Sequence, residues 1–283
     1  MPLLGAHMSI AGGFHLAFDR ISEVRGEAMQ IFVKNQRQWQ APALSPEAVE
    51  LFRQRWEQSG RIPIAAHGTY LINLATSDPE VAGKSIGALA DELGRTQALG
   101  IPYLIMHPGA HMGQGVQQGL LFFVSNLDRA IELSHVGDVV VLVETTAGQG
   151  TQLGSTFEEI ALILTTSRYR DRLGVCFDTC HAFAAGYDVR DHESYDKTFS
   201  RFDEIIGLDR LKFFHLNDSK RDLGSSVDRH EHIGQGKIGL AAFGLLLNDP
   251  RFRHHPMVLE TPKGKDPTND IENLRLLRSL VKL

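Results

Sequence analysis

The segment Val139–Glu144 reads VVVLVE, five consecutive aliphatic residues followed at once by a carboxylate. An apolar run of this length without alternation is typical of a strand buried on both faces of a parallel sheet. Similar runs recur along the chain at Leu3–Ala6, Met29–Val33, Ile62–Ala66, Tyr103–Met106, Leu173–Phe177, Leu211–Phe214 and Met257–Leu259. The segment at Val139 is therefore the fifth of eight expected strands.

Signals for the start and end of helices lie between these runs. Ser45 and Pro46 predict the start of one helix, Asp78 and Pro79 the start of another, and Gly100 its end. Eight strands alternating with helices in 283 residues predict a closed (β/α)₈ TIM barrel, an architecture that typically takes about 250 residues. We expect residues 1–283 to form this single domain. A doubly wound open sheet is the alternative, but no Gly-rich dinucleotide motif follows any expected strand.

The composition narrows the class of protein. Hydrophobic residues make up 42% and charged residues 22%, which is too apolar for a disordered chain. The aliphatic runs are far shorter than the ~20 residues of a membrane span, and the N-terminus has no secretory pattern. Two cysteines cannot build a disulfide scaffold. We therefore expect a cytoplasmic location, and separately we expect a monomer. Its net charge of −5 argues against purely electrostatic binding of nucleic acid, although bound metal ions could reverse the charge locally.

A polar or ionisable residue follows each of the eight apolar runs. In chain order these residues are His7, Lys34, His67, His107, Glu144, Asp178, His215 and Glu260. Because the carboxyl ends of barrel strands meet at one rim, where active sites of this architecture lie, these side chains should converge. Each one alone has an ordinary explanation as a loop or capping residue. A crowd of carboxylates and imidazoles is costly unless protons or cations neutralise it, so the joint pattern favours a metal centre.

Two local spacings add candidate ligands. His181 follows Asp178 by three positions, and Asp228 and His230 are two positions apart, which places them side by side in an extended segment. The nine candidate metal ligands are then His67, His107, Glu144, Asp178, His181, His215, Asp228, His230 and Glu260. This number exceeds what one tetrahedral ion can use, so two or three ions with bridging carboxylates are implied. Imidazole and carboxylate together suit zinc, manganese or iron.

Three loops are suited to a nucleic acid. Lys34–Gln40 mixes cations, amides and an aromatic residue, Gly68–Asn73 offers an aromatic and an aliphatic side chain, and Ser219–Lys237 is rich in cations. Cations hold phosphates, amides reach base edges, and an apolar wedge can enter a base stack. The alternative for Trp39 is that it packs under its own loop. The expected DNA contacts are Lys34, Arg37, Gln38, Tyr70, Leu71 and Arg229.

The chain resembles the endonuclease IV family of apurinic/apyrimidinic (AP) endonucleases over essentially its whole length. The resemblance rests on GAH at 5–7, KNQRQW at 34–39, HGTYLIN at 67–73, HPGAH at 107–111, ETTAGQG at 144–150, GVCFDTCHAFAAGYD at 174–188, HLNDSK at 215–220, VDRHEHIGQGKIG at 227–239 and LET at 259–261. Several long motifs in the same order are much more specific than any single metal-ligand spacing.

This resemblance implies a barrel with three metal ions, usually zinc, that cuts DNA on the 5′ side of an abasic site. Manganese remains an alternative at one or more sites. The implied ligand groups are His67, His107 and Glu144; Glu144, Asp178, His215 and Glu260; and His181, Asp228 and His230. Arg37, Gln38, Tyr70 and Leu71 match minor-groove loops that bend the duplex and fill the gap while the abasic nucleotide turns outward.

Residues beside the ligands have more ordinary expected roles. Cys176 should point into the barrel as a core residue, and Cys180 is taken as structural. His232 is an alternative to His230 as a ligand. Thr145 and Glu231 depart from the family pattern, and neither is an expected ligand, so only the geometry around the ligands is affected.

The expected reaction is in-line attack on the phosphate by a hydroxide held between two ions, with Glu260 orienting or deprotonating it and Glu144 bridging. The products would be a 3′-hydroxyl and a 5′-deoxyribose phosphate. Duplexes with blocked 3′ ends are expected as further substrates. A metal-dependent sugar isomerase or epimerase on the same barrel is the alternative enzyme, and it leaves His181, Asp228 and His230 unexplained. A non-catalytic binder of damaged DNA is a second alternative.

Overall fold

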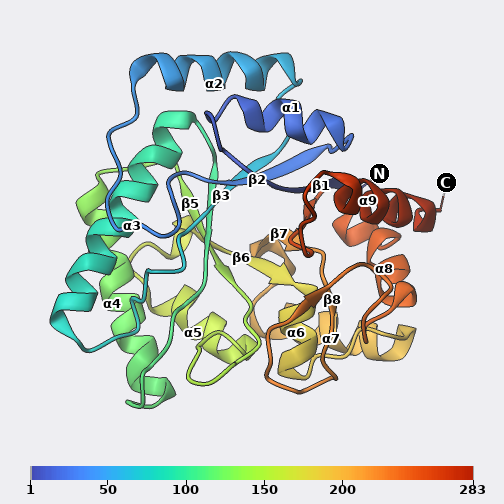
Figure 1. Ribbon diagram of the computed structural model, residues 1–283. Coiled ribbons are helices and arrows are strands. Elements are labelled where there is room, and N and C mark those ends of the chain that lie inside the picture. Colours follow the sequence, from blue (N-terminus) through green and yellow to red (C-terminus); the bar gives the residue numbers. More distant parts are fainter. Residues whose placement is uncertain (1, 283) are drawn as a thin grey trace.

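The computed structural model describes residues 2–282, and within this range eight parallel strands close into a barrel (Figure 1). The order around the barrel is β1-β10-β7-β6-β5-β4-β3-β2. These strands are β1 Leu3–Met8, β2 Ala28–Phe32, β3 Ile64–His67, β4 Tyr103–Met106, β5 Val140–Glu144, β6 Leu173–Asp178, β7 Leu211–His215 and β10 Pro256–Leu259. The expected TIM barrel is therefore confirmed.

Helices surround the barrel and follow the strands in sequence (Figure 1). They are α1 Leu16–Glu23, α2 Pro46–Gln58, α3 Pro79–Leu99, α4 Val116–Ser134, α5 Phe157–Thr166, α6 Thr179–Ala185, α7 His192–Ile205, α8 Leu240–Leu247 and α9 Thr268–Leu280. The predicted caps are confirmed, because Ser45 and Asp78 accept backbone N–H groups and Gly100 ends α3 in the left-handed conformation. Within residues 2–282 no helix has the length and hydropathy that crossing a membrane requires.

The strand boundaries differ slightly from the apolar runs. The run at Ile62–Ala66 becomes a strand only from Ile64, because Pro63 has no N–H to donate to a neighbouring strand. The second strand ends at Phe32, before Val33 and Lys34. Lys34 therefore lies beyond the ladder of hydrogen bonds rather than at its last position, which changes the environment of its side chain.

The barrel interior is built in layers that follow the alternation of side chains along each strand. One buried layer consists of Ala28, Ala65, Ile105, Leu142, Cys176, Phe213 and Val258. At Gly5 on β1 the neighbouring strand comes so close that a Cβ atom would lie 1.7 Å from the Ala28 carbonyl oxygen. Residues two positions further along these strands point into the barrel as well, at its carboxyl end. Cys176 thus lies in the core as predicted.

The long loop after β7 folds around a buried carboxylate. It contains a two-stranded antiparallel sheet, β8 Asp218–Ser219 with β9 His230–Glu231. The Asp218 carboxylate accepts hydrogen bonds from the backbone N–H groups of Ser219, Gly234, Gly236, Ile238 and Gly239, at 2.8–3.3 Å. A Cβ at Gly236 would come within 2.4 Å of Asp218 Oδ1, so only glycine fits there. Asp218 therefore holds the loop in the shape that carries Asp228 and His230.

Candidate metal centre

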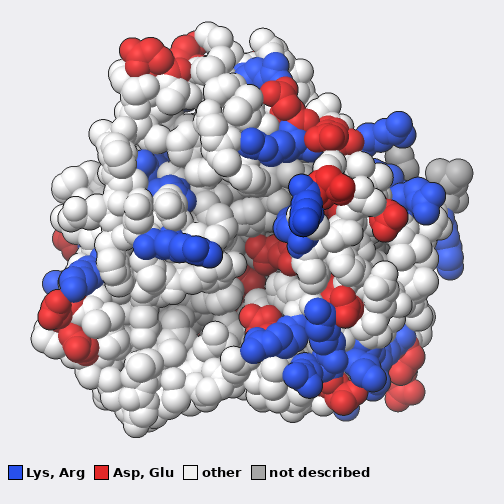
Figure 2. Space-filling view, viewed as in Figure 1, with Lys and Arg blue, Asp and Glu red and all other residues white. Residues whose placement is uncertain are grey.

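A ring of polar side chains lies directly above the buried layer, one from each barrel strand or the residue after it. Its members are His7, Gln30, His67, His107, Glu144, Asp178, His215 and Glu260. Most of the ring is buried, and Glu144, Asp178 and His215 have no exposed surface. Figure 2 shows the result from outside, a central hollow with acidic side chains on its floor and lysines and arginines around its border. A cavity of about 350 Å³ in this region is lined by His67, His107 and Asp228, among others.

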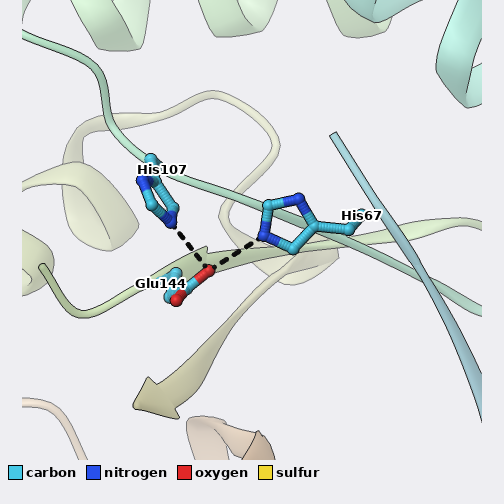
Figure 3. A group of neighbouring side chains, drawn as sticks. All are labelled: His67, His107 and Glu144. Carbon is cyan, nitrogen blue, oxygen red and sulfur yellow. Dashed lines mark hydrogen bonds and ion pairs between the residues drawn. The ribbon is translucent and has the colours of Figure 1, made fainter. Parts of the chain in front are cut away.

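The first ligand group joins two histidines to one carboxylate oxygen. His67 Nε2 and His107 Nε2 each lie 3.2 Å from Glu144 Oε2, and the three side chains point toward one another from β3, the end of β4 and β5 (Figure 3). Ligand atoms that bind one tetrahedral zinc ion at about 2.1 Å are themselves roughly 3.3 Å apart. The spacing of these three atoms fits a shared ion.

The second group continues from the other oxygen of the same carboxylate. His215 Nδ1 lies 3.1 Å from Glu144 Oε1, 3.2 Å from Glu260 Oε2 and 3.7 Å from Asp178 Oδ2. The ligand atoms of these four residues all lie within 4.8 Å of one another. Glu144 therefore faces both groups, one with each oxygen, which is the geometry of a bridging carboxylate.

The third group combines a strand-end helix with the loop after β7. His181 on α6 places Nε2 3.2 Å from Asp228 Oδ2 and 3.3 Å from His230 Nε2. Asp178 also approaches, with Oδ2 3.8 Å from His230 Nε2. Asp228 and His230 are partly exposed, whereas the second group lies deeper. The structure thus brings all nine predicted ligands together, and around the third group Asp178 lies close to His181 and His230 while Cys180 lies close to Asp228 and His230.

The ligand nitrogen and oxygen atoms at the centre face one another with their lone pairs. In four of the histidines the other ring nitrogen is already engaged with a carbonyl oxygen: His67 with Gly68 at 2.7 Å, His181 with Thr145 at 2.9 Å, His230 with Glu260 at 3.1 Å, and His215 with the Gln30 side chain at 2.7 Å. A neutral imidazole that donates its N–H to such a carbonyl oxygen directs the lone pair of its other nitrogen to the centre. There it faces carboxylate oxygens, which also carry lone pairs. Only a cation or additional protons can satisfy this arrangement. The residues therefore fit a group of divalent ions.

The shifted pKa values of the ligands also show that the centre favours added positive charge. Burial opposes the charged form of Glu144, but the imidazoles of His107 and His215 outweigh it and hold the pKa of that carboxyl well below its usual range. For His181, burial favours the neutral ring, yet Asp178, Asp228 and Glu144 raise its pKa well above the ordinary value. Despite burial, the pKa values of His67 and His215 are raised by neighbouring carboxylates as well, so in the absence of metal, protons on these three rings would supply part of the missing positive charge.

Five of the six predicted DNA contacts lie in loops near the rim. Arg37, Gln38 and Arg229 are exposed, and Leu71 is half-buried. The Tyr70 side chain is 62% exposed, and its ring packs 5.7 Å from that of His67 and 6.1 Å from that of His107, measured between centroids. Tyr70 therefore stands beside the centre with an open face toward solvent.

Lys34 is the exception, and it is not available as a DNA contact. Its Nζ lies 3.1 Å from the carboxylate of Glu92 on α3, and it donates to the carbonyl oxygens of Trp39 and Ala88. The side chains of Lys34 and Glu92 have no exposed surface. Glu92 in turn accepts from the Thr69 backbone N–H and hydroxyl. The pair therefore fastens the loops after β2 and β3 to α3, and Trp39 packs against the core beneath its own loop.

Three buried residues at the centre escaped the sequence analysis. Gln30 donates to Glu260 Oε1 at 2.6 Å, and Asn217 donates to Asp178 Oδ2 at 2.7 Å while accepting from the Glu260 backbone N–H. Asp218 shapes the ligand-bearing loop. Gln30 lies two positions after Ala28, so the alternation of the strand could have identified it in place of Lys34. No comparable periodic signal points to Asn217 or Asp218, because both lie beyond the end of β7.

The neighbouring residues behave as structural groups. Burial raises the pKa of the Cys176 and Cys180 thiols to about 12, so both stay protonated at neutral pH, although Cys180 lies close to Asp228 and His230. His232 Nδ1 accepts from Asn273 instead of joining the centre. Thr145, which departs from the family pattern, accepts the Asp178 backbone N–H through Oγ1.

Comparison with known proteins agrees with this geometry. Residues 18–280 match the family described as xylose isomerase-like TIM barrel. A relative named probable endonuclease 4 from Chloroflexus aggregans is 53% identical over 283 residues, covering 100% of this chain and 99% of the relative. The crystal structure of endonuclease IV from Thermus thermophilus has a TM-score of 0.88 and 39% identity, covering 99% of this chain and 98% of that one. A D-tagatose 3-epimerase-like protein (TM-score 0.73, 18% identity, covering 98% and 96%) shares the fold. The chain belongs to the endonuclease IV family of xylose isomerase-like TIM barrels.

Proposed function

We propose that this chain is a DNA-repair AP endonuclease that hydrolyses the phosphodiester 5′ to an abasic site, leaving a 3′-hydroxyl and a 5′-deoxyribose phosphate. Cleaning of blocked 3′ ends belongs to the same proposal. The observation that carries it is the convergence of nine imidazole and carboxylate ligands, with lone pairs facing one another, at the floor of a hollow bordered by cationic loops. Membership of the endonuclease IV family supports the same activity.

The centre would hold three divalent ions, with zinc the first choice and manganese an alternative for some positions. The residues that would hold them are His67, His107 and Glu144; Glu144, Asp178, His215 and Glu260; and His181, Asp228 and His230, with Asp178 close to the last group. When bound, such ions supply positive charge for the phosphate oxygens and acidify water to a pKa near 7.

The side chains of the chain itself have separate tasks. Glu260 has an oxygen directed at His215 Nδ1 and another held by Gln30, so its rotamer is fixed and it can accept the proton of the attacking water. Burial opposes ionisation of Glu260, but in the metal-free centre a protonated His215 imidazole holds the pKa of this carboxyl well below its usual range. Glu144 keeps two ligand groups at a fixed separation.

The loops around the hollow would select the substrate. Arg37 and Arg229 are exposed cations able to contact phosphates, and Gln38 can reach a base edge. Tyr70 and Leu71 lie where an apolar wedge would fill the space left by the missing base. An abasic nucleotide has no base to unstack, so turning it outward into the hollow is cheaper than for an intact nucleotide.

The test is gel cleavage of a duplex that carries one abasic analogue, beside the intact duplex, with metal content measured on the same sample. Incision 5′ to the analogue with about three ions per chain is the expected result. Full metal content without incision would contradict the proposal. A panel of ketoses and aldoses assayed on that sample would then decide for or against the sugar isomerase.

A further inference from the structure

His215 differs from three other ligand histidines in what fixes its ring. The rings of His67, His181 and His230 are held by backbone carbonyl oxygens, which are present whatever side chain the sequence supplies. The Nε2 of His215 instead donates to the side-chain oxygen of Gln30, at 2.7 Å. The tautomer of His215 thus depends on a group that a substitution can remove.

The same amide also holds a carboxylate. Gln30 Nε2 lies 2.6 Å from Glu260 Oε1 and 2.8 Å from His7 Nδ1, and Gln30 has no exposed surface. The orientation of the amide follows from these neighbours, because the reverse orientation would press its oxygen against the Glu260 carboxylate. Every polar atom of the Gln30 side chain therefore has a partner, and no freedom remains for it to rotate.

We propose that Gln30 is a positioning residue that sets the tautomer of His215 and the rotamer of Glu260 together. Holding the proton of His215 on Nε2 directs the lone pair of Nδ1 to the point that Glu144 and Glu260 also face. Without the Gln30 oxygen, the proton can move to Nδ1 and bind the carboxylates directly, so three metal ligands would satisfy one another instead of an ion. The proposal rests on the proposed function of this centre.

The expected consequences are confined to the metal centre. Gln30 is a fully buried member of the ring and cannot touch a DNA duplex, so its loss should leave substrate binding intact. Partners of this kind, which orient a metal ligand without binding the metal, typically contribute 10- to 100-fold to metal affinity or activity. A role in core packing alone would alter the stability of the barrel and leave the His215 tautomer unchanged.

The experiment replaces Gln30 with methionine, which has a similar length and cannot form these hydrogen bonds. Gln118→Met on the exposed surface of α4 is the matched control. For Gln30→Met we expect roughly 10- to 100-fold weaker retention of metal in competition with a chelator. The kcat on an abasic duplex should fall by a similar factor at unchanged KM. In the metal-free protein, at a pH high enough to make the His215 ring neutral, ¹⁵N-resolved imidazole NMR should show His215 protonated on Nε2 in the parent and on Nδ1, at least in part, in the variant.

Unchanged metal retention and an unchanged His215 tautomer in a folded Gln30→Met variant would overturn the proposal. If that variant does not fold, Gln30→Glu serves instead. It keeps an acceptor for His215 but sets a second carboxylate against Glu260, so the tautomer should persist while kcat falls, and an unaltered kcat would contradict the role. If the parent protein binds metal but does not incise, the proposed function fails, whereas the chelator and NMR comparisons still decide the role of Gln30.

Discussion

The Lys34–Glu92 pair and the metal centre both bury ionisable side chains, but they satisfy their charges in opposite ways. At the pair, the Lys34 ammonium lies 3.1 Å from the buried Glu92 carboxylate and 3.6 Å from the partly exposed Asp91 carboxylate, and the remaining donors and acceptors reach Trp39, Ala88 and Thr69. At the centre, carboxylate oxygens meet imidazole lone pairs, and nothing in the described part of the chain supplies the missing charge. The first arrangement is complete in itself, whereas the second requires a ligand from outside.

This difference distinguishes structural from functional burial of charge. A closed ion pair costs its own desolvation and can often be replaced by apolar side chains of similar volume. An open cluster is unfavourable without its cations, so its persistence indicates a task that offsets that cost. The two regions should therefore respond differently to the same kind of substitution.

The largest effect is expected at Glu260. Glu260→Gln removes the charge and the proton acceptor while keeping the shape of the side chain, so single-turnover incision of an abasic duplex should fall about 10²- to 10⁴-fold, the range typical of a general base. Binding of the duplex, measured by fluorescence anisotropy, should persist, because Glu260 lies at the floor of the hollow. Retained incision would refute the role assigned to Glu260.

The closed pair should tolerate replacement of both partners but not of one. Lys34→Met leaves the Glu92 carboxylate buried without its cation, and the free energy of unfolding should drop by about 3–5 kcal/mol. Adding Glu92→Leu to the same chain should restore most of that loss. Urea denaturation of the parent, both single variants and the double variant measures the coupling. A double variant as unstable as Lys34→Met would show that the pair is not self-contained.

His230 tests the outer edge of the open cluster. His230→Asn removes a ligand that comes from the loop rather than from a barrel strand, so metal analysis should show the loss of one ion per chain. Incision should fall less than for Glu260→Gln, by roughly 10- to 100-fold. His232→Asn, two positions along, is the control and should keep its full metal content. Equal metal loss in both variants would show that the third group is assigned wrongly.

The pH dependence of Lys34→Met sharpens the comparison. Burial raises the pKa of Glu92 even with Lys34 beside it, and removing the cation should raise that pKa further. The Glu92 carboxyl then binds a proton more readily in the folded than in the unfolded state. The loss of unfolding free energy caused by its buried charge is therefore complete above the pKa of Glu92 in the folded variant. It is relieved as the pH falls toward 4.5, the ordinary pKa of a glutamate. The deficit in unfolding free energy relative to the parent should therefore shrink between neutral and mildly acidic pH. A constant deficit would exclude the buried carboxylate as its source.

The smallest effect is expected at Arg229, which is exposed and lies between two ligands in sequence. If it contacts a phosphate, Arg229→Ala should lower the slope of log affinity against log salt concentration by about 1. Arg253→Ala, on the amino side of β10 and so at the opposite end of the barrel, should leave the slope unchanged. Equal slopes in both variants would remove Arg229 from the set of DNA contacts.

Much of this arrangement follows from patterns within single strands. The eight aliphatic runs predict the barrel, and the polar residues after them predict most of the rim, since strand ends in this fold converge. The error at Lys34 shows the limit of that rule. Counting from the end of an apolar run gives Lys34, whereas counting by alternation from Ala28 gives Gln30, and the side-chain alternation decides which residue points inward.

Other parts of the site depend on contacts between segments far apart in the chain. Asn217 links Asp178 to the backbone of Glu260, and no spacing within one strand encodes that contact. The partition of the ligands into three groups came from the family resemblance rather than from the spacing of residues. The pairing of Lys34 with Glu92, 58 positions away, likewise depends on how α3 packs against the loop after β2.

The Asp218 carboxylate has a consequence for how this protein can vary. Its hydrogen bonds are made with backbone N–H groups, so most side chains between Ser219 and Gly239 can change without disturbing them. An inserted or deleted residue, by contrast, would shift the backbone N–H groups of residues 234, 236, 238 and 239. Their hydrogen bonds to both oxygens of the Asp218 carboxylate would then be lost together. Selection should therefore act on the length of this loop more strictly than on its composition, with Gly236 and the ligands Asp228 and His230 as positions where composition is also fixed.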